Sequence, residues 1–317
     1  MVAFEAKDTP HQRFSSQPAK RFQSCFTSDI KQHAYWLDLL PAQPSLPDRP
    51  VKKIDVVIVG SGYTGLNAAL ETIRGGRSTL VLDSENPGCG CSTRNGGQIS
   101  TSIKPSLSDL TAKYGLKKAC AIRKEGENAL QWIETLIKRE KIKCDFNHSG
   151  RYHAAHTPKH YEAIARDAEQ LNNKEGIEAY TIPKADQRKE LGSDVYFGGV
   201  VFPSHASVNP GLYHRGLLDR AVEAGVHVTG NCHVSGLRQE QNRFILSTSK
   251  GEVSARDVII GTNGYTTDLT PWLQRRVIPI GSYVIATEEL PIELVDTLFP
   301  TDRIASDTCK VVYYYRT

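Results

Sequence analysis

The feature that most constrains the fold is segment 54–59, IDVVIV, which runs directly into a GxGxxG motif formed by Gly60, Gly62 and Gly65. A continuous β-branched run of this kind is typical of a strand that is buried on both faces. Apolar residues then recur at helical spacing over 66–73, so the chain must turn from a strand into a helix at Gly60. The sequence therefore predicts a βα unit with a tight glycine turn.

The glycines and the residues after them are typical of a dinucleotide site. Gly60 permits the turn, Gly62 lets the backbone approach a pyrophosphate, and Gly65 lets the helix pack closely against the strand. The first turn of the helix, which includes Thr64, then points free N–H groups and the positive end of its dipole at the phosphates. Asp83 ends the next predicted strand, about 20 residues beyond the glycines, where a carboxylate meets the ribose hydroxyls and repels the 2′-phosphate of NADP.

A second glycine-rich loop follows at residues 92–98, with the sequence STRNGGQ. Paired glycines allow backbone N–H groups to approach a flat ring without interference from side chains, and Arg94 offers a fixed positive charge for a diphosphate. The loop is therefore expected to meet the ring system of the cofactor. This expectation favours FAD over a nicotinamide nucleotide.

Composition and charge narrow the class of protein. With 39% hydrophobic and 23% charged residues, the 317-residue chain can bury a substantial core, which fits two domains or one large one. The net charge of +4 and the lack of a Lys/Arg cluster give no reason to expect a nucleic-acid partner. No apolar run approaches the length of a membrane span, and the first residues include Glu5 and Asp8. We therefore expect a cytoplasmic protein with a small-molecule partner and leave its oligomeric state open.

Cysteine and histidine give no sign of a metal site. The seven cysteines are odd in number and lack CxxC pairs, which argues against a disulfide framework and against zinc. The ten histidines lack a convergent carboxylate or cysteine pattern. We expect reduced thiols and no metal.

Periodicity and caps predict the other elements. Segments 110–141 and 159–171 fit helices with polar outer faces, and Asn209 with Pro210 is typical of the N-cap and first turn of a helix that ends near 224–225. Strand-like runs occupy 151–155, 198–202, 226–229, 234–239, 244–249, 251–254, 257–264, 276–287 and 310–316.

The first fifty residues predict an arm that precedes the nucleotide unit. They are polar and contain several prolines, and we expect the arm to dock on the folded body through Tyr35, Trp36, Leu37, Leu39 and Leu40. The predicted division of the chain is an arm at 1–50, FAD-binding parts at 51–145 and 206–270, and substrate-domain parts at 146–205 and 271–317.

Four segments form a combined pattern: DVVIVGSGYTGLNAALET, STRNGGQ, DVIIGTNGYT and RRVIPIGSYVIATEEL. Together they resemble the FAD-dependent D-amino-acid oxidase (DAO) superfamily, closest to its gamma-glutamylputrescine oxidoreductase branch, from about residue 35 to the end of the chain. GxGYTGL followed by SxRNGGQ is more selective than the glycine motif alone. The resemblance implies an α/β fold, with an FAD-binding Rossmann-like (doubly wound) domain with a β-meander and an antiparallel-sheet α+β substrate domain.

The resemblance also implies roles for individual residues. The glycines of the first motif would hold the pyrophosphate and Asp83 the adenosine ribose. Val234, on the strand of the second βαβ half, would contact the adenine region through its backbone, and Thr262 to Gly264 would close the floor beneath the cofactor. The flavin end would be held by Ser92, Arg94, Asn95, Gly96, Gly97 and Gln98.

The implied reaction is oxidation of the C–N bond of an amine or amino acid, with hydride passing to the flavin and an imine as first product. No catalytic acid or base is obligatory, and whether O2 or another acceptor reoxidises the flavin is open. Tyrosines on segments that face the flavin in this family could line the pocket, although such a run on a strand also fits simple packing. They are Tyr283, Tyr313, Tyr314 and Tyr315.

Relatives continue for roughly another hundred residues, whereas this sequence stops within a strand pattern at Tyr315-Arg316-Thr317. We therefore expect a fold that is incomplete at its C-terminus. Three hypotheses follow: a flavin amine oxidase or dehydrogenase known from an incomplete sequence, a flavin- or nucleotide-binding fragment without activity, and an NAD-dependent dehydrogenase. The third must treat the RNGGQ loop and the late DVIIGTNG strand as coincidence.

Overall fold

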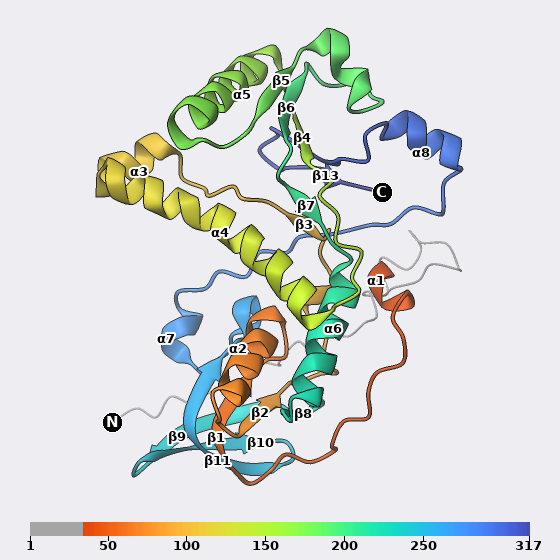
Figure 1. Ribbon diagram of the computed structural model, residues 1–317. Helices are drawn as coiled ribbons and strands as arrows, with labels where there is room; N and C mark the ends of the chain where they lie inside the picture. The colour runs from red at the N-terminus through yellow and green to blue at the C-terminus, as the bar shows by residue number, and fades with distance from the viewer. Residues whose placement is uncertain (1–33) are drawn as a thin grey trace, which may run out of the picture.

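The computed structural model describes residues 34–317, and its strands form two large sheets and one small one (Figure 1). The six-stranded sheet lies in the lower part of the figure and the five-stranded sheet in the upper part. The long helix α4 (Leu116–Glu140) runs between these two regions.

The six-stranded sheet combines a parallel and an antiparallel half. Its order is β8 (His227–Thr229), β2 (Thr79–Leu82), β1 (Lys53–Val59), β11 (Gly251–Ile260), β10 (Arg243–Thr248) and β9 (Val234–Glu240). The pairs β8·β2, β2·β1 and β1·β11 are parallel, whereas β11, β10 and β9 form an antiparallel meander. The predicted doubly wound unit with a meander is therefore confirmed.

Strand β11 corrects the sequence-based boundaries. The expected separate strands at 251–254 and from 257 onward are one continuous strand. Its first half pairs with β10 through 251–255, and its second half pairs with β1 through 254–260. The polar pair Arg256-Asp257 suggested a break, but a strand with a different neighbour on each half continues through it.

Two helices cover one face of this sheet. Helix α2 (Tyr63–Arg74) and helix α6 (Pro210–Glu223) pack together and bury Leu66, Leu70 and Leu217, each at most 1% exposed, in a core that also includes the end of α4. The side chain of Asn209 accepts a hydrogen bond from the Leu212 N–H at 3.1 Å, which confirms the predicted N-cap of α6. An ion pair of 2.7 Å between Arg74 and Glu140 links α2 to α4.

The five-stranded sheet has the order β13 (Tyr314–Tyr315), β12 (Ile304–Asp307), β4 (Arg151–Ala154), β6 (Gly199–Phe202) and β5 (Tyr180–Ile182). It is antiparallel except for the parallel pair β12·β4. Helix α5 (Pro158–Gln170) covers one face of β6 and β5, and Tyr152, Tyr196 and Tyr315 pack on the other. The mixed α+β architecture of this part was expected.

The predicted strand at 276–287 is wrong. The described chain has no strand there, and Ile278, Ile280 and Ile285 are 83%, 85% and 90% exposed. Alternating apolar residues become a strand only when a neighbouring strand is available for backbone pairing, and this segment pairs with no strand of the described chain. The expected strand at 310–316 is reduced to β13, the two residues that pair with β12.

The remaining elements are short connections. They are α1 (Tyr35–Asp38), η2 (Cys91–Thr93), β3 (Gln98–Ile99), α3 (Leu107–Tyr114), η3 (Leu171–Glu175), η4 (Lys184–Lys189), β7 (Ala206–Ser207), η5 (Asn263–Tyr265), α7 (Pro271–Gln274) and α8 (Ile292–Leu298). Strands β3 and β7 form a two-stranded antiparallel sheet. We keep the predicted domain boundaries as a proposal, because the two large sheets draw on interleaved parts of the chain.

Part of the predicted arm lies in the described chain. Leu40 and Trp36 pack against Gly211 of α6, and Arg215 donates to the carbonyls of Pro41 and Ala42 at 2.8 Å. Tyr35 and Leu39, which were expected to dock, stay 51% and 49% exposed. Residues 1–33 of the arm lie outside the described chain.

Candidate dinucleotide site

At two of the three motif positions in the turn between β1 and α2, only glycine fits. Gly60 has φ +102°, and a Cβ added there would lie 2.7 Å from the Gly261 carbonyl oxygen. A Cβ added to Gly65 would lie 1.9 Å from the Gly60 oxygen. These two glycines let the strand, the helix and the end of β11 come together.

Gly62 differs, because nothing within the fold demands a glycine there. Its φ is −69°, which any residue can adopt, and an added Cβ would meet only the Ser92 hydroxyl, at 3.0 Å. Gly62 is the N-cap of α2 and lacks a side-chain cap, while the Ser92 hydroxyl accepts from the Tyr63 N–H at 3.1 Å. The bare backbone at this helix start suits an approaching phosphate.

Asp83 lies beside this turn, as its spacing predicted. Its Oδ2 accepts from the N–H of Ser61 at 2.8 Å and from the Ser61 hydroxyl at 2.5 Å, and its Oδ1 accepts from the Glu85 N–H at 3.0 Å. A carboxylate has about four acceptor positions, so capacity remains for a ribose hydroxyl.

A buried histidine contacts this turn, and no motif in the sequence indicated it. His214 of α6 is 2% exposed, and its Nε2 lies 2.8 Å from the Ser61 carbonyl oxygen. Burial lowers the pKa of His214, which keeps the ring neutral, and Nε2–H donates because a carbonyl can only accept. Ser61 and His214 are 153 positions apart, so no local pattern could join them.

Hydrogen bonds of the Asn95 side chain hold the second glycine loop in place. Its amide nitrogen donates to the carbonyls of Cys91 and Ser92 at 3.0 and 3.1 Å, and its Oδ1 accepts from the Gly97 N–H at 2.9 Å. The indole N–H of Trp36 donates to the Asn95 carbonyl at 2.8 Å. The arm therefore holds the same loop from outside.

Close packing explains the paired glycines of this loop. Gly97 has φ +64°, and an added Cβ would lie 2.0 Å from the Val208 oxygen. A Cβ on Gly96 would meet the Tyr314 ring at 3.1 Å. Gln98 donates to the Tyr315 carbonyl at 3.2 Å, so the loop connects to β13 of the five-stranded sheet. Arg94 is exposed beside it.

The end of β11 completes the site. Gly261, next to Thr262, contacts the Gly60 turn, and the Asn263 amide lies 3.5 Å from the Cys91 sulfur at the start of the second loop. The Thr262 hydroxyl hydrogen-bonds that of Thr266 at 2.7 Å, and a Cβ added to Gly264 would meet only Pro279, at 3.9 Å. Three segments distant in sequence therefore meet at one edge of the sheet.

One sequence expectation needs correction here, and Tyr315 follows the packing alternative. Val234 starts β9, a meander strand, and not a strand of a second βαβ half. Its side chain packs in the core with Val59 and Leu82 behind Asp83, and its backbone contact with adenine stays a prediction. Tyr315 is partly buried in the sheet's core and donates to the Tyr196 hydroxyl at 3.1 Å.

The other tyrosines expected near a flavin lie in exposed positions. Tyr283, Tyr313 and Tyr314 are 93%, 64% and 40% exposed. Of these three, Tyr314 packs against Gly96 of the second glycine loop.

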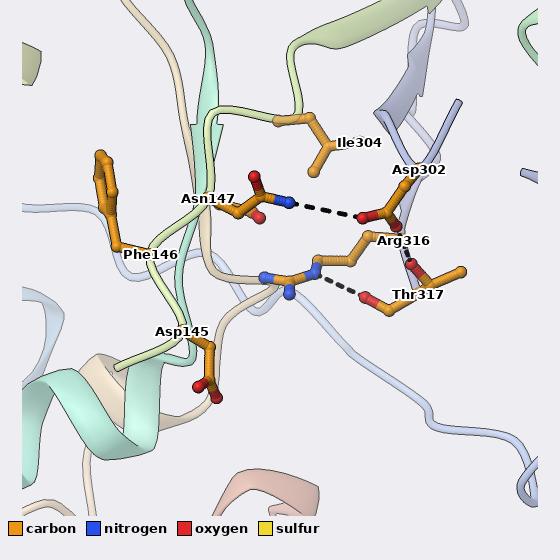
Figure 2. Close-up of a pocket in the computed structure, with 8 residues that line it drawn as sticks. Asp145, Phe146, Asn147, Asp302, Ile304, Arg316 and Thr317 are labelled. Atoms are coloured by element: carbon orange, nitrogen blue, oxygen red, sulfur yellow. Dashed lines mark hydrogen bonds between the residues drawn. The ribbon is translucent and has the colours of Figure 1, made fainter. Parts of the chain in front are cut away.

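Figure 2 shows a pocket of about 360 Å³ that none of the predicted site residues lines. Asn147 donates to Asp302, and the Thr317 hydroxyl donates to the same carboxylate. Arg316 connects the pocket to the second loop, because its Nη1 donates to the Val208 carbonyl, which packs on Gly97. The lining residues are Asp145, Phe146, Asn147, Ser207, Asp302, Ile304, Arg316 and Thr317.

The arrangement fits FAD. Gly62 leaves the start of α2 open although the fold does not require a glycine there, which is the cradle that a pyrophosphate needs. The Asp83 carboxylate lies beside this turn, and the loop with the paired glycines Gly96 and Gly97 is held by Asn95. Residues 34–317 contain no cluster that could hold a metal ion, and none of their helices is long and apolar enough to cross a membrane.

The sequence profile of the family described as "FAD dependent oxidoreductase" (DAO) matches residues 55–317, so the chain belongs to this family. The chain is 31% identical over 266 residues to gamma-glutamylputrescine oxidoreductase of Escherichia coli, which covers 83% of the chain and 61% of that relative. It is also 26% identical over 275 residues to a Haemophilus influenzae protein named as an oxidoreductase, OrdL, covering 85% of the chain and 64% of that relative. FAD is the cofactor of the family.

Solved structures show the same fold. Glycine oxidase from Geobacillus kaustophilus superposes with a TM-score of 0.57 at 20% identity, covering 69% of this chain and 58% of that one. L-proline dehydrogenase from P. horikoshii gives 0.55 at 18% identity, covering 68% of this chain and 54% of that one. The chain thus spans less than two thirds of the length of these relatives.

Proposed function

We propose that the protein oxidises the C–N bond of an amine or amino acid with FAD, giving an imine that hydrolyses to an aldehyde or keto product. The observation that carries this proposal is the meeting of the Gly60 turn, the Asn95 loop and the end of β11 beside Asp83. A nicotinamide site would use the turn and the carboxylate, but it would leave the Asn95 loop without a role.

Each part of the site has a proposed task. The N–H groups at the start of α2, including that of Thr64, would bind the pyrophosphate, and Asp83 would bind the adenosine ribose. The flavin end would lie against the loop from Ser92 to Gln98, with Thr262 to Gly264 beneath it. FAD, when bound, supplies the acceptor for the substrate's hydride.

We further propose a gamma-glutamylputrescine-like amine as substrate. The similarity of 31% to gamma-glutamylputrescine oxidoreductase supports this choice. Glycine oxidase and L-proline dehydrogenase share the fold, and their identities of 20% and 18% support no particular substrate.

A second candidate is a protein that binds FAD without turning over an amine. The observation that favours it is the exposure of Tyr283 and of segment 276–287, which were expected to cover the flavin. The two candidates share the cofactor site and differ in whether a closed, water-poor pocket forms above it.

Purified protein titrated with FAD and then mixed anaerobically with amines separates the candidates. The proposal expects a yellow protein that gamma-glutamylputrescine bleaches faster than glycine or L-proline. Yellow protein that no amine bleaches supports the second candidate. A protein that binds NAD and leaves FAD free would overturn both.

A further inference from the structure

The turn between α3 and α4 is an exposed basic surface outside the dinucleotide site. It comprises residues 113–118, with the sequence KYGLKK, and all of these residues are exposed. Gly115 is the single residue between the two helices, and it has a φ of +77°, which suits glycine. Tyr114 and Leu116, on either side of it, are 41% and 60% exposed. We call residues 113–118 the α3–α4 tip.

The α3–α4 tip lies far from the core that the other end of α4 enters. There, Leu136 and Ile137 are 2% and 7% exposed and pack with residues of α2 and α6. A helix of 25 residues is about 37 Å long, so the tip lies roughly this far from the other end of α4. In Figure 1, α3 and the start of α4 lie at the left edge of the molecule. The fold therefore presents the tip at its outer edge.

The α3–α4 tip combines positive charge with an aromatic ring. The amines of Lys113 and Lys118 lie 5.0 and 5.4 Å from the centre of the Tyr114 ring, and Lys117 follows in the first turn of α4. No carboxylate of residues 34–317 forms an ion pair with any of these three lysines. Their charge is therefore available to an anionic partner.

The local sequence adds to this charge. Segment 110–124 contains five Lys or Arg residues and no Asp or Glu. The acidic side chains of Asp109 and Glu127, beyond the two ends of this segment, already have partners in a capping box and in an ion pair with Lys124. The expectation that the chain lacks a Lys/Arg cluster is therefore corrected: cations that are spread over two helices in the sequence come together where these helices meet.

We propose that the α3–α4 tip binds the surface of an anionic membrane. The lysines would lie among the anionic headgroups, and Tyr114 and Leu116 at the boundary with the acyl chains. The long apolar stems of the lysines suit the same boundary, because they keep the charged amine in water. This binding is peripheral and independent of the flavin reaction.

The size and composition of the tip favour a membrane over two other anionic partners. A stable protein interface buries about 800 Å² on each partner, from roughly 20–30 residues, and the tip has far fewer. Proteins that bind single-stranded nucleic acid combine a basic groove with several stacking rings. The tip has one aromatic ring, and its most exposed apolar side chain is Leu116, which is aliphatic.

The test measures how much of the full chain sediments with large vesicles. Vesicles of phosphatidylcholine alone are compared with vesicles of equal parts phosphatidylcholine and phosphatidylglycerol. We expect at least tenfold tighter binding to the anionic vesicles, and release of most of the protein when salt is raised from about 50 mM to about 500 mM. One lysine near such a surface contributes about fivefold in affinity, so Lys117→Gln combined with Lys118→Gln should weaken binding about 25-fold.

Matched controls separate the tip from charge and apolar exposure elsewhere. Lys141→Gln combined with Lys143→Gln removes the same charge from exposed lysines at the other end of α4 and should leave binding within twofold of the wild type. Leu116→Ser should weaken binding at least threefold. Trp132→Ser, which changes another exposed apolar residue of α4, should not.

Several results would overturn the proposal. They are equal binding to the two kinds of vesicle, no binding to the anionic vesicles, and equal losses in the two lysine pairs. Wild-type binding in Leu116→Ser would reduce the contact to adsorption of charge and would also overturn it. Binding of polyglutamate as tight as that of the anionic vesicles would assign the tip to an acidic protein instead.

Discussion

Replacement of Gly62 by alanine should separate cofactor binding from folding. The new Cβ would meet only the Ser92 hydroxyl at 3.0 Å, which can rotate away, and the φ of −69° suits alanine. Loss of the hydrogen bond between the Tyr63 N–H and the Ser92 hydroxyl would destabilise the fold by about 1 kcal/mol. Alanine also reduces the conformational entropy of the unfolded chain, which stabilises the fold by about 0.4–1 kcal/mol. The unfolding free energy should therefore change by less than about 1 kcal/mol. FAD should nevertheless bind about 10- to 100-fold more weakly, because a methyl group displaces the pyrophosphate from charge-assisted N–H contacts worth about 1.5–3 kcal/mol.

Gly65→Ala is the matched control. Its Cβ would lie 1.9 Å from the Gly60 oxygen, about 1.5 Å short of the ordinary 3.4 Å contact, so helix and strand must separate. We expect a loss of more than about 3 kcal/mol in unfolding free energy for this variant. Urea unfolding and FAD titration monitored by flavin fluorescence measure both quantities. Wild-type FAD affinity in Gly62→Ala would refute the assignment of the α2 start as the pyrophosphate site.

Three further variants test separate contacts. Trp36→Phe removes the hydrogen bond to Asn95, worth about 1 kcal/mol, and should weaken FAD binding about fivefold in a titration; unchanged affinity would show that other contacts hold the loop. Glu140→Gln should lower the unfolding free energy by about 1–3 kcal/mol at pH 7. Because Arg74 lowers the pKa of Glu140, this deficit should shrink as the pH falls below the ordinary value of 4.5, and a deficit constant with pH would contradict the ion pair. Burial lowers the pKa of His205 to about 3, so the unfolded chain binds the proton first as the pH falls, and wild-type stability should decrease between pH 6.5 and 3. In denaturant titrations, His205→Gln should reduce this decrease. An equal dependence of stability on pH in the variant and the wild type would count against the buried neutral ring.

Sequence patterns correctly predicted the parts of the fold that depend on interactions between residues close together in the chain. The βα unit at Gly60 follows from strand and helix periodicity within a few residues, and the cap at Asn209 follows from one side chain and its own helix. Asp83 followed from a spacing that the length of one helix and one strand fixes.

The sequence could not reveal contacts between distant segments. His214 supports Ser61 from 153 positions away, and Trp36 holds Asn95 from 59 positions away. The segment 276–287 has the alternation of a strand, yet a strand exists only where a partner ladder is available. Pairing depends on the whole fold, so alternation alone gave a false prediction there.

A crystal structure of the protein soaked with FAD tests the central claim most directly. The account predicts the pyrophosphate at the start of α2 over Gly62, a ribose hydroxyl hydrogen-bonded to Asp83, and the flavin ring against the loop from Asn95 to Gln98. FAD bound at another place, or its absence from this edge of the sheet at saturating concentration, would contradict it.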